Sequence, residues 1–186
     1  MAWRSSWRGC DKDGGYSLDR GHLARFLERM HSMDAILNAL QLAFPDDEFE
    51  PRHVPFDETF ITLPANHLHA AVEILVAQFD LHHLSTITGQ DTGDAIELLY
   101  HFWWGKGLTL RTALPYASLS IATVTDVIVG AAFYEREIME MLGVTFEGHP
   151  EPKPLFLPDD WAGGEPLRKT FVPLAEPESP GKEPVE

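Results

Sequence analysis

The chain has 186 residues, which is enough for one domain with a substantial hydrophobic core. Hydrophobic residues make up 44% of it, but no stretch approaches the ~18 uninterrupted apolar residues that a membrane span requires, so we expect no membrane-spanning helix. The formal net charge of −15 disfavours nonspecific binding to nucleic acid or to an anionic membrane surface, both of which reward clustered Lys and Arg. We therefore expect a protein or small-molecule partner and no nucleic acid.

Cys10 is the only cysteine, so no internal disulfide forms and this chain alone builds no Cys-based zinc or iron–sulfur site. We expect no cofactor in this chain, and any electron carrier lies on a neighbouring subunit. The N-terminus lacks the apolar core of a secretory signal, which fits a cytoplasmic protein.

Residues 1–32 differ from the rest of the chain in charge. They hold six of the fourteen Lys and Arg against four acids, so this segment is +2 in a chain of −15. We expect an N-terminal arm that is disordered or weakly helical, or a misassigned start with the true start at Met30 or Met33.

Residues 33–146 show regular periodicity and are expected to form an α+β core domain. An acidic cap and apolar spacing predict a helix over 34–44, "TFITL" predicts a strand over 59–63, and Pro64 begins a helix that runs to Phe79. Three runs rich in β-branched and aromatic residues follow, and the separators Asp-Thr-Gly-Asp and Gly-Lys-Gly between them resemble hairpin turns. We therefore predict an antiparallel meander.

A second amphipathic helix is predicted over 131–142, where one face carries apolar residues expected to pack on the sheet: Ala131, Tyr134, Ile138, Met141 and Leu142. The charged residues of this helix are left for its margins and outer face: Glu135, Arg136, Glu137 and Glu140. Gly143 stands where a left-handed C-cap falls, and "VTF" predicts a short returning strand.

Residues 147–186 hold nine of the fourteen prolines and show little periodicity. Their first part keeps several large apolar side chains, whereas "LAEPESPGKEPVE" has the composition of disorder. We expect an extended partner-binding tail that is disordered at its end.

Nine histidines raise the possibility of a metal site, but their spacing disfavours it. His67 and His69 would lie ~200° apart on a helix, and the adjacent His82 and His83 would face opposite ways on a strand. His101 and His149 are candidate ligands or bases, although a lone histidine beside aromatic or turn residues is more often a hydrogen-bonded structural residue.

Two roles are open for the charged turn at 135–140. No nucleophile elbow, Walker loop or dinucleotide fingerprint is present, so catalysis would rest on these acids, as in a stand-alone metal- or carboxylate-dependent enzyme using Glu137 and His149. Alternatively Arg136, which can pair with Glu140 four residues on, ties the helix to a second chain. A regulatory binding module is a third possibility.

The runs "YEREIMEMLGVTFEGHP", "LFLPDDW" and "PLRK" closely resemble the signature of the NuoC family of respiratory complex I, also called the 30-kilodalton subunit. The family includes the equivalent subunits of chloroplast-type NDH complexes and of membrane-bound energy-converting hydrogenases. The similarity is strongest over residues 110–171 and rests on the order of elements over residues 34–109. Residues 1–32 have no counterpart in the family. Met139, Leu142 and Thr170 depart from the pattern of the family, so the branch of the family to which the chain belongs stays open. The form "LPDDW" favours the hydrogenase, F420-type or chloroplast-type complexes.

The resemblance implies an α+β domain with an antiparallel or mixed sheet of four to five strands packed against two to three helices and an extended proline-rich C-terminal tail. It implies a non-catalytic subunit in the hydrophilic arm of a membrane-bound NADH–quinone-type oxidoreductase, peripheral on the cytoplasmic side of the membrane. The partners implied are a hydrogenase-large-subunit-like (D-type) protein and iron–sulfur subunits, with the tail along the D-type protein. The subunit-interface residues that the resemblance implies are Glu135, Arg136, Glu137, Glu140, His149, Pro150, Trp161, Leu167, Arg168 and Lys169.

In this interpretation the chain holds together a quinone-reducing or a proton-reducing module, so that clusters on neighbouring subunits keep their electron-transfer distances. The electron donor and acceptor lie on other chains and stay open.

Overall fold

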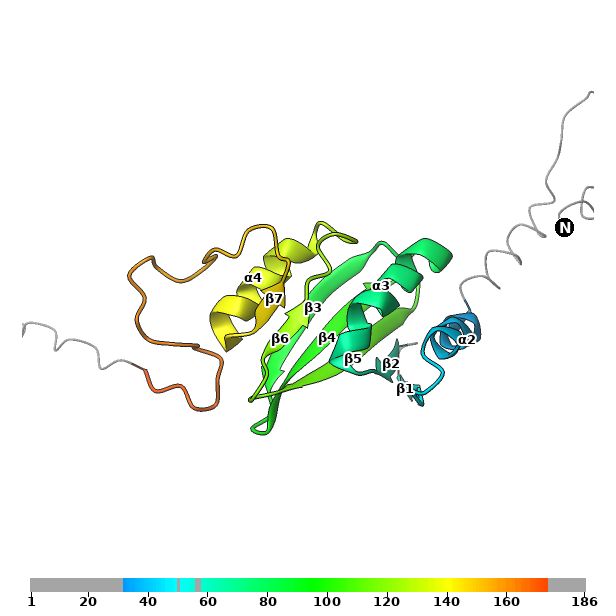
Figure 1. Cartoon of the computed structure of the whole chain (residues 1–186), viewed down its shortest axis with the longest axis horizontal. Coiled ribbons are helices and arrows are strands. Elements are labelled where there is room, and N and C mark those ends of the chain that lie inside the picture. The colour runs from blue at the N-terminus through cyan, green and yellow to red at the C-terminus, as the bar shows by residue number, and fades with distance from the viewer. Residues whose placement is uncertain (1–31, 50, 56–57, 174–186) are drawn as a thin grey trace, which may run out of the picture.

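The computed structural model describes residues 32–49, 51–55 and 58–173 (Figure 1). In this part of the chain three helices and a five-stranded mixed sheet form the α+β fold that the sequence predicts. The helices are α2 (Met33–Ala43), α3 (Ala65–Phe79) and α4 (Ala131–Leu142). The strands are β1 (Arg52–Val54), β2 (Glu58–Thr62), β3 (Leu84–Asp91), β4 (Ala95–Trp103), β5 (Gly107–Pro115), β6 (Ser120–Ala122) and β7 (Thr145–Glu147).

The larger sheet has the strand order β1-β2-β5-β4-β3. The expected meander is confirmed, because β3, β4 and β5 pair antiparallel through turns in which Gly93 and Gly105 adopt positive φ. The pair β2 and β5 is parallel, and β6 pairs parallel with β7 in a separate two-stranded sheet. The returning strand predicted at 144–146 is present as β7, shifted by one residue towards the C-terminus.

Helices α3 and α4 cover one face of the sheet (Figure 1). On β4 this face buries alternate residues, namely Ile96, Leu98, Tyr100 and Phe102. Gly89 on β3 lets α4 approach closely, since a Cβ atom at that position would lie 2.5 Å from Leu142 Cδ1. Because Gly89 has no side chain, α4 can lie close to the sheet.

The helix boundaries agree with the sequence pattern to within one residue. One cap differs: Ser32, and not Asp34, caps α2, because the Ser32 Oγ accepts a hydrogen bond from the Ala35 amide at 3.2 Å while Asp34 already lies in the first helical turn. Asp80, the residue after the end of α3, is its C-cap and adopts a left-handed conformation with φ of 56°.

Two parts of the proposed domain organisation cannot be compared with the structure. The N-terminal arm, except Ser32, and the end of the tail at 174–186 lie outside the described residues. Between 148 and 173 the described chain holds no helix or strand. None of the helices in the described part of the chain is long and apolar enough to span a bilayer.

Candidate functional site

The charged helix α4 packs on β3 through the face that the sequence predicts. Ala131, Ile138 and Leu142 are buried, and the half-buried Tyr134 donates its hydroxyl hydrogen to the Ser85 carbonyl at 2.9 Å. Gly143 ends the helix with φ of 69°, a conformation that favours glycine. The predicted apolar face of α4 is therefore the face that packs on the sheet.

Glu135 contradicts the expectation that it lies on the margin or outer face, because it is fully buried. Its carboxylate accepts hydrogen bonds from Thr123 Oγ1 at 2.5 Å and from the Val124 amide at 2.8 Å. Burial raises the pKa of this carboxyl, and the two hydrogen bonds oppose that rise in part. The polarity pattern of the helix does not reveal the burial of Glu135, because the loop that covers this residue precedes the helix and supplies the hydrogen-bond donors.

His149 joins the Gly-His-Pro turn to the start of α4. Its Nδ1 accepts from the Glu151 amide at 3.0 Å, so Nε2 carries the proton and donates to the Ala132 carbonyl at 3.2 Å. The same Nε2 lies 4.0 Å from Glu135 Oε2, and both side chains are shielded from solvent. Pro150, next in the chain, is exposed. His149 thus has the structural role of a hydrogen-bonded turn residue.

Arg136 does not pair with Glu140 as the helical spacing suggested. Its Nε donates to the Lys153 carbonyl at 2.8 Å, and its Nη2 donates to the Pro154 carbonyl at 2.6 Å. The guanidinium therefore binds the chain's own C-terminal segment in this structure. We call residues 150–171 the strap.

Glu140 holds the strap immediately after the part that Arg136 holds. Its carboxylate accepts hydrogen bonds from the three successive amides of residues 155–157, at 3.3, 2.9 and 2.8 Å. Successive amides that converge on an anion are a common way to bind a carboxylate. One helical turn thus offers donors to the strap's carbonyls and an acceptor to its amides.

The far end of the strap returns to the C-terminus of α4. The Leu167 amide donates to the Met141 carbonyl at 3.0 Å, and Arg168 Nε donates to the Leu142 carbonyl at 2.6 Å. These carbonyls belong to the last helical turn, where no intrahelical donor is available. The strap therefore caps the helix it lies on.

The hairpin between β3 and β4 holds the next residue of the strap. The Lys169 amide donates to Asp91 Oδ2 at 2.9 Å, and Lys169 Nζ donates to the Thr92 carbonyl at 2.6 Å. Asp91 also accepts from the Tyr116 hydroxyl, over whose ring the Arg168 guanidinium lies 5.5 Å from the centroid. Sequence reasoning missed Asp91 and Tyr116, since no local pattern links residues so far apart.

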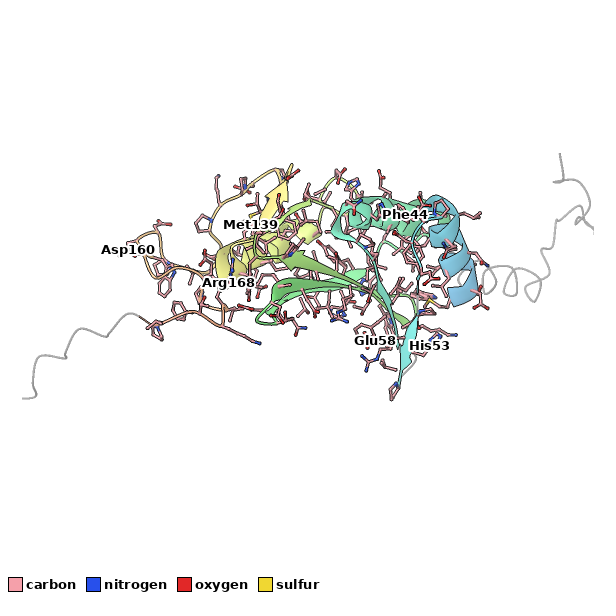
Figure 2. All side chains as sticks on the ribbon, turned by 60° about the horizontal axis from the view of Figure 1, so that its bottom comes forward. Phe44, His53, Glu58, Met139, Asp160 and Arg168 are labelled. Carbon is pink, nitrogen blue, oxygen red and sulfur yellow. The ribbon has the colours of Figure 1, made fainter. Side chains whose placement is uncertain are left out.

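The middle of the strap extends away from the sheet, with Asp160 at its far end and Arg168 back beside α4 (Figure 2). Trp161 is 39% exposed, donates its indole N–H to the Gly164 carbonyl at 2.7 Å and stacks on Phe171. Phe156 and Leu167, at the two ends, are 62% and 56% exposed. Large apolar side chains are therefore displayed along the strap.

Glu137 and His149, the residues of the alternative enzyme hypothesis, are not brought into one open site. Glu137 is exposed and makes no hydrogen bond or ion pair to another described residue, whereas both ring nitrogens of buried His149 are already engaged. Within the described ranges, no set of three or more His, Cys, Asp or Glu is arranged to hold a metal ion.

Three of the other histidines considered as ligands or bases, His67, His69 and His101, each have a partner of their own. His67 Nδ1 lies 2.6 Å from Asp47 Oδ2, and His69 Nε2 lies 2.9 Å from Asp126 Oδ2. His101, on the sheet face away from the helices, lies between two threonine hydroxyls, and burial lowers its pKa.

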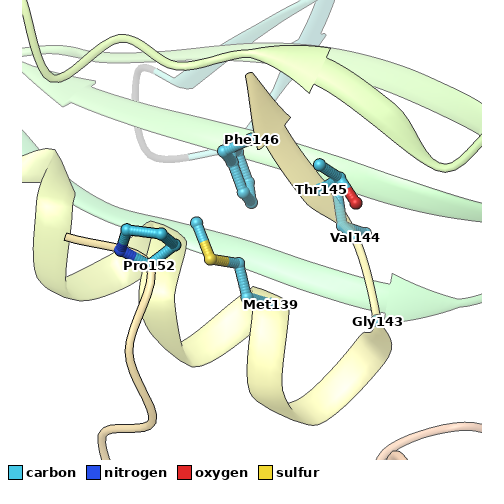
Figure 3. Close-up of a pocket in the computed structure, with 6 residues that line it drawn as sticks. All are labelled: Met139, Gly143, Val144, Thr145, Phe146 and Pro152. Carbon is cyan, nitrogen blue, oxygen red and sulfur yellow. The ribbon is translucent and has the colours of Figure 1, made fainter. Parts of the chain in front are cut away.

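A cavity of about 300 Å³ lies between α4, β7 and the strap (Figure 3). It is lined by Met139, Gly143, Val144, Thr145, Phe146 and Pro152. Its lining contributes one hydroxyl and no titratable side chain, so it has no acid–base pair with which to work on a substrate.

The chain matches the family described as "Respiratory-chain NADH dehydrogenase, 30 Kd subunit" over residues 61–177. The chain belongs to this family. The matched region contains α4 and the whole strap, so the contacts described above lie between parts of the family region.

The relatives of this 30 Kd subunit include proteins of several complexes. Over 104 residues it is 39% identical to the C subunit of F(420)H(2) dehydrogenase from Methanosarcina mazei, covering 53% of this chain and 66% of that protein. Over 144 residues it is 31% identical to the C subunit of NADH-quinone oxidoreductase from Moorella thermoacetica, covering 75% of this chain and 95% of that protein. The C/D subunit of the Yersinia pestis NADH-quinone oxidoreductase is 35% identical over 103 residues, which are 52% of this chain and 17% of that protein.

Two solved structures have a similar fold. The trypsin-resistant fragment of Nqo5 aligns with a TM-score of 0.55 and 20% identity, covering 64% of this chain and 98% of that chain. A chain of the membrane-bound sulfane sulfur reductase, an archaeal respiratory membrane complex, aligns with a TM-score of 0.61 and 25% identity, covering 76% and 86%. The protein is thus a 30 kDa-type subunit of a respiratory or energy-converting complex.

Proposed function

We propose that this chain is a non-catalytic subunit of the hydrophilic arm of a complex I-like oxidoreductase, and that it docks on the D-type subunit that resembles a hydrogenase large subunit. It holds no redox centre of its own. The iron–sulfur clusters lie on partner subunits, and the chain keeps them at electron-transfer distances while electrons pass to quinone. It works at the cytoplasmic side of the membrane as a peripheral part of the complex.

The observation that carries this proposal is how the strap is held. Two of the four charged residues of this helix turn, Arg136 and Glu140, are engaged in fixing the strap, and large apolar side chains are left exposed along it. Exposed apolar side chains on a fixed segment are typical of a protein-binding surface.

The fused C/D relatives support the choice of partner. In the Yersinia pestis protein the part that this chain matches shares a polypeptide with a D-type part, as its name states. Fusion of the relatives of two proteins into one polypeptide indicates that the two proteins bind each other. A D-type protein is therefore the first partner to test.

Two alternatives stay in competition. The same docking role in a proton-reducing energy-converting hydrogenase would use the same strap and differ only in the partner's chemistry. A stand-alone metal-dependent enzyme using Glu137 and His149 belongs to another class, and it requires His149 to leave its present hydrogen bonds.

A mild-detergent pull-down of the tagged chain from its native membranes, with mass spectrometry of all retained proteins, tests the proposal. Co-purification of a D-type protein and an iron–sulfur subunit supports docking, and the other subunits retained identify the donor and the acceptor. Untagged membranes provide the control. A chain that is recovered alone with one tightly bound metal ion per molecule would overturn the proposal in favour of the enzyme.

A further inference from the structure

Among the described residues, hydrogen bonds attach the strap to the folded body only near its two ends, and between these ends the Glu165 side chain lies beside Gly143. Every hydrogen bond that residues 158–166 form within the described chain stays inside the strap. Arg136 and Glu140 hold residues 153–157 at one end, and the last turn of α4 with Asp91 holds residues 167–169 at the other. The shape of the middle segment therefore depends on these two attachments.

The side chains that fix the strap differ in kind from those it exposes. The charged groups of Arg136 and Glu140 form hydrogen bonds with the backbone of the strap, so these bonds do not depend on the strap's side chains. Phe156, Trp161 and Leu167 remain exposed by 62%, 39% and 56%. A partner that binds the strap therefore meets these apolar groups, while the charged groups of Arg136 and Glu140 are already hydrogen-bonded to the strap.

We propose that Arg136 and Glu140 are positioning residues that pre-shape the strap, and that Phe156, Trp161 and Leu167 are the side chains that contact the D-type subunit on an apolar-lined surface. This inference rests on the docking proposed above. It replaces the simpler hypothesis that Arg136 itself forms an ion pair with the second chain. The choice of a D-type occupant follows from the C/D relatives, in which both parts belong to one polypeptide.

Pre-shaping has a direct consequence for affinity. An extended segment without helix or strand loses conformational freedom when it binds, and ordering its side chains and backbone opposes association. A strap already held at both ends has lost most of that freedom before binding. Removing one attachment should therefore weaken docking although no contact residue has changed.

The helix offers a matched control for the test. Glu137 has the same chemistry as Glu140 and lies on the same helix, but it is exposed and makes no polar contact to another described residue. Glu140→Ala removes the acceptor of three strap amides, and Glu137→Ala removes a carboxylate of equal charge with no such role.

The first measurement is amide hydrogen exchange on the full-length chain. We expect Glu140→Ala to raise the exchange rates at residues 155–157 at least ~10-fold, because each amide loses its acceptor, whereas Glu137→Ala leaves them unchanged. The amide of Leu98 in the central strand should stay protected in both variants, which shows that the domain is still folded. Unchanged exchange at residues 155–157 in Glu140→Ala would overturn the inference.

The second measurement is the affinity of the same variants for the purified D-type subunit. We expect Glu140→Ala and Phe156→Ala each to weaken binding by ~10-fold or more, but only Glu140→Ala to change exchange at Leu155 and Leu157. Faster exchange with unaltered affinity would show that the attachment does not serve docking. If the wild-type chain does not bind the D-type subunit, the proposed function fails and the positioning role with it, whereas the exchange data still decide whether Glu140 fixes the strap.

Discussion

Glu135 Oε2 lies 4.0 Å from His149 Nε2, and neither side chain is exposed to solvent. The two residues come from α4 and from the turn that follows β7, so their proximity fastens the start of the helix to the turn that begins the strap. Glu135 also satisfies the Val124 amide, which would otherwise be buried without an acceptor. One carboxylate thus joins three segments of the chain where the strap begins.

The burial of Glu135 predicts a pH dependence of stability. Because burial raises its pKa in the folded state above the unfolded value, its contribution to the free energy of unfolding is fully present below the unfolded pKa and is lost as pH rises through the folded pKa. We expect the wild-type protein to gain stability relative to Glu135→Gln as the pH falls through the raised pKa of the folded state towards the ordinary pKa of a glutamate. Urea denaturation at several pH values measures this difference.

The charges near Glu135 set the control for this experiment. The negative charge of Asp126 adds to the rise in the pKa of the Glu135 carboxyl and remains in the variant, so the two proteins differ only at residue 135. Glu137→Gln, which removes an exposed carboxylate from the same helix, is the matched control. A stability difference between wild type and Glu135→Gln that does not change with pH would contradict the prediction.

The close approach of α4 to β3 at Gly89 predicts an overpacking effect. A side chain at this position meets Leu142 Cδ1 and Ile138 Cγ1, at 2.5 and 3.3 Å from the Cβ, so Gly89→Val should lower the free energy of unfolding by about 1–3 kcal/mol. Adding Leu142→Ala should make the cost of Gly89→Val smaller, because the added methyl groups then occupy the space that Leu142 leaves. Chemical denaturation of the four members of this double-mutant cycle measures the coupling, and strictly additive effects would show that the contact does not limit the approach.

The three helices, β2, the meander and β7 could be predicted from sequence because their signals are local, whereas the short strands β1 and β6 were not predicted. The 3.6-residue spacing of α3 and α4, the alternation in β4 and the glycine-containing turns each lie within one short window. Ser32 was missed as a cap because Asp34, two residues later, is an equally good cap by composition, and only the backbone geometry distinguishes them.

The arrangement of the site could be predicted only in part. Arg136 and Glu140 were identified as important residues, and helical spacing allowed a pair between them. That spacing contains no information about a strap backbone that offers two acceptors and three donors. Glu135 was assigned to the outside because polarity along a helix normally marks the solvent side. Asp91 meets Lys169 across 78 residues, a separation for which a single sequence gives no pattern.

The carboxyl of Asp91 connects the hairpin to the strap and should titrate abnormally. The hydrogen bond from the Tyr116 hydroxyl is the main cause that lowers its pKa, and the hydrogen bond from the Lys169 amide adds to the effect. We expect Tyr116→Phe to move the pKa of Asp91 back towards its ordinary value. Tyr134→Phe is the matched control, because that hydroxyl donates to the Ser85 carbonyl. Carboxyl carbon NMR over an acid titration measures both variants, and an unmoved Asp91 resonance profile in Tyr116→Phe would contradict the assigned cause.

Charge reversal at Arg136 separates folding from assembly. Arg136→Glu removes the donors to the Lys153 and Pro154 carbonyls and places a carboxylate beside the strap, so this end of the strap should detach. The buried face of α4 does not include Arg136, and we expect the free energy of unfolding to change by less than about 1 kcal/mol. In native membranes, by contrast, the yield of assembled complex should fall several-fold, as measured by native gel electrophoresis and the recovery of the D-type subunit. Arg136→Lys keeps the positive charge but lacks the forked geometry that reaches two carbonyls, so its assembly should be intermediate. Normal assembly with Arg136→Glu in a folded protein would exclude a role for this residue in docking.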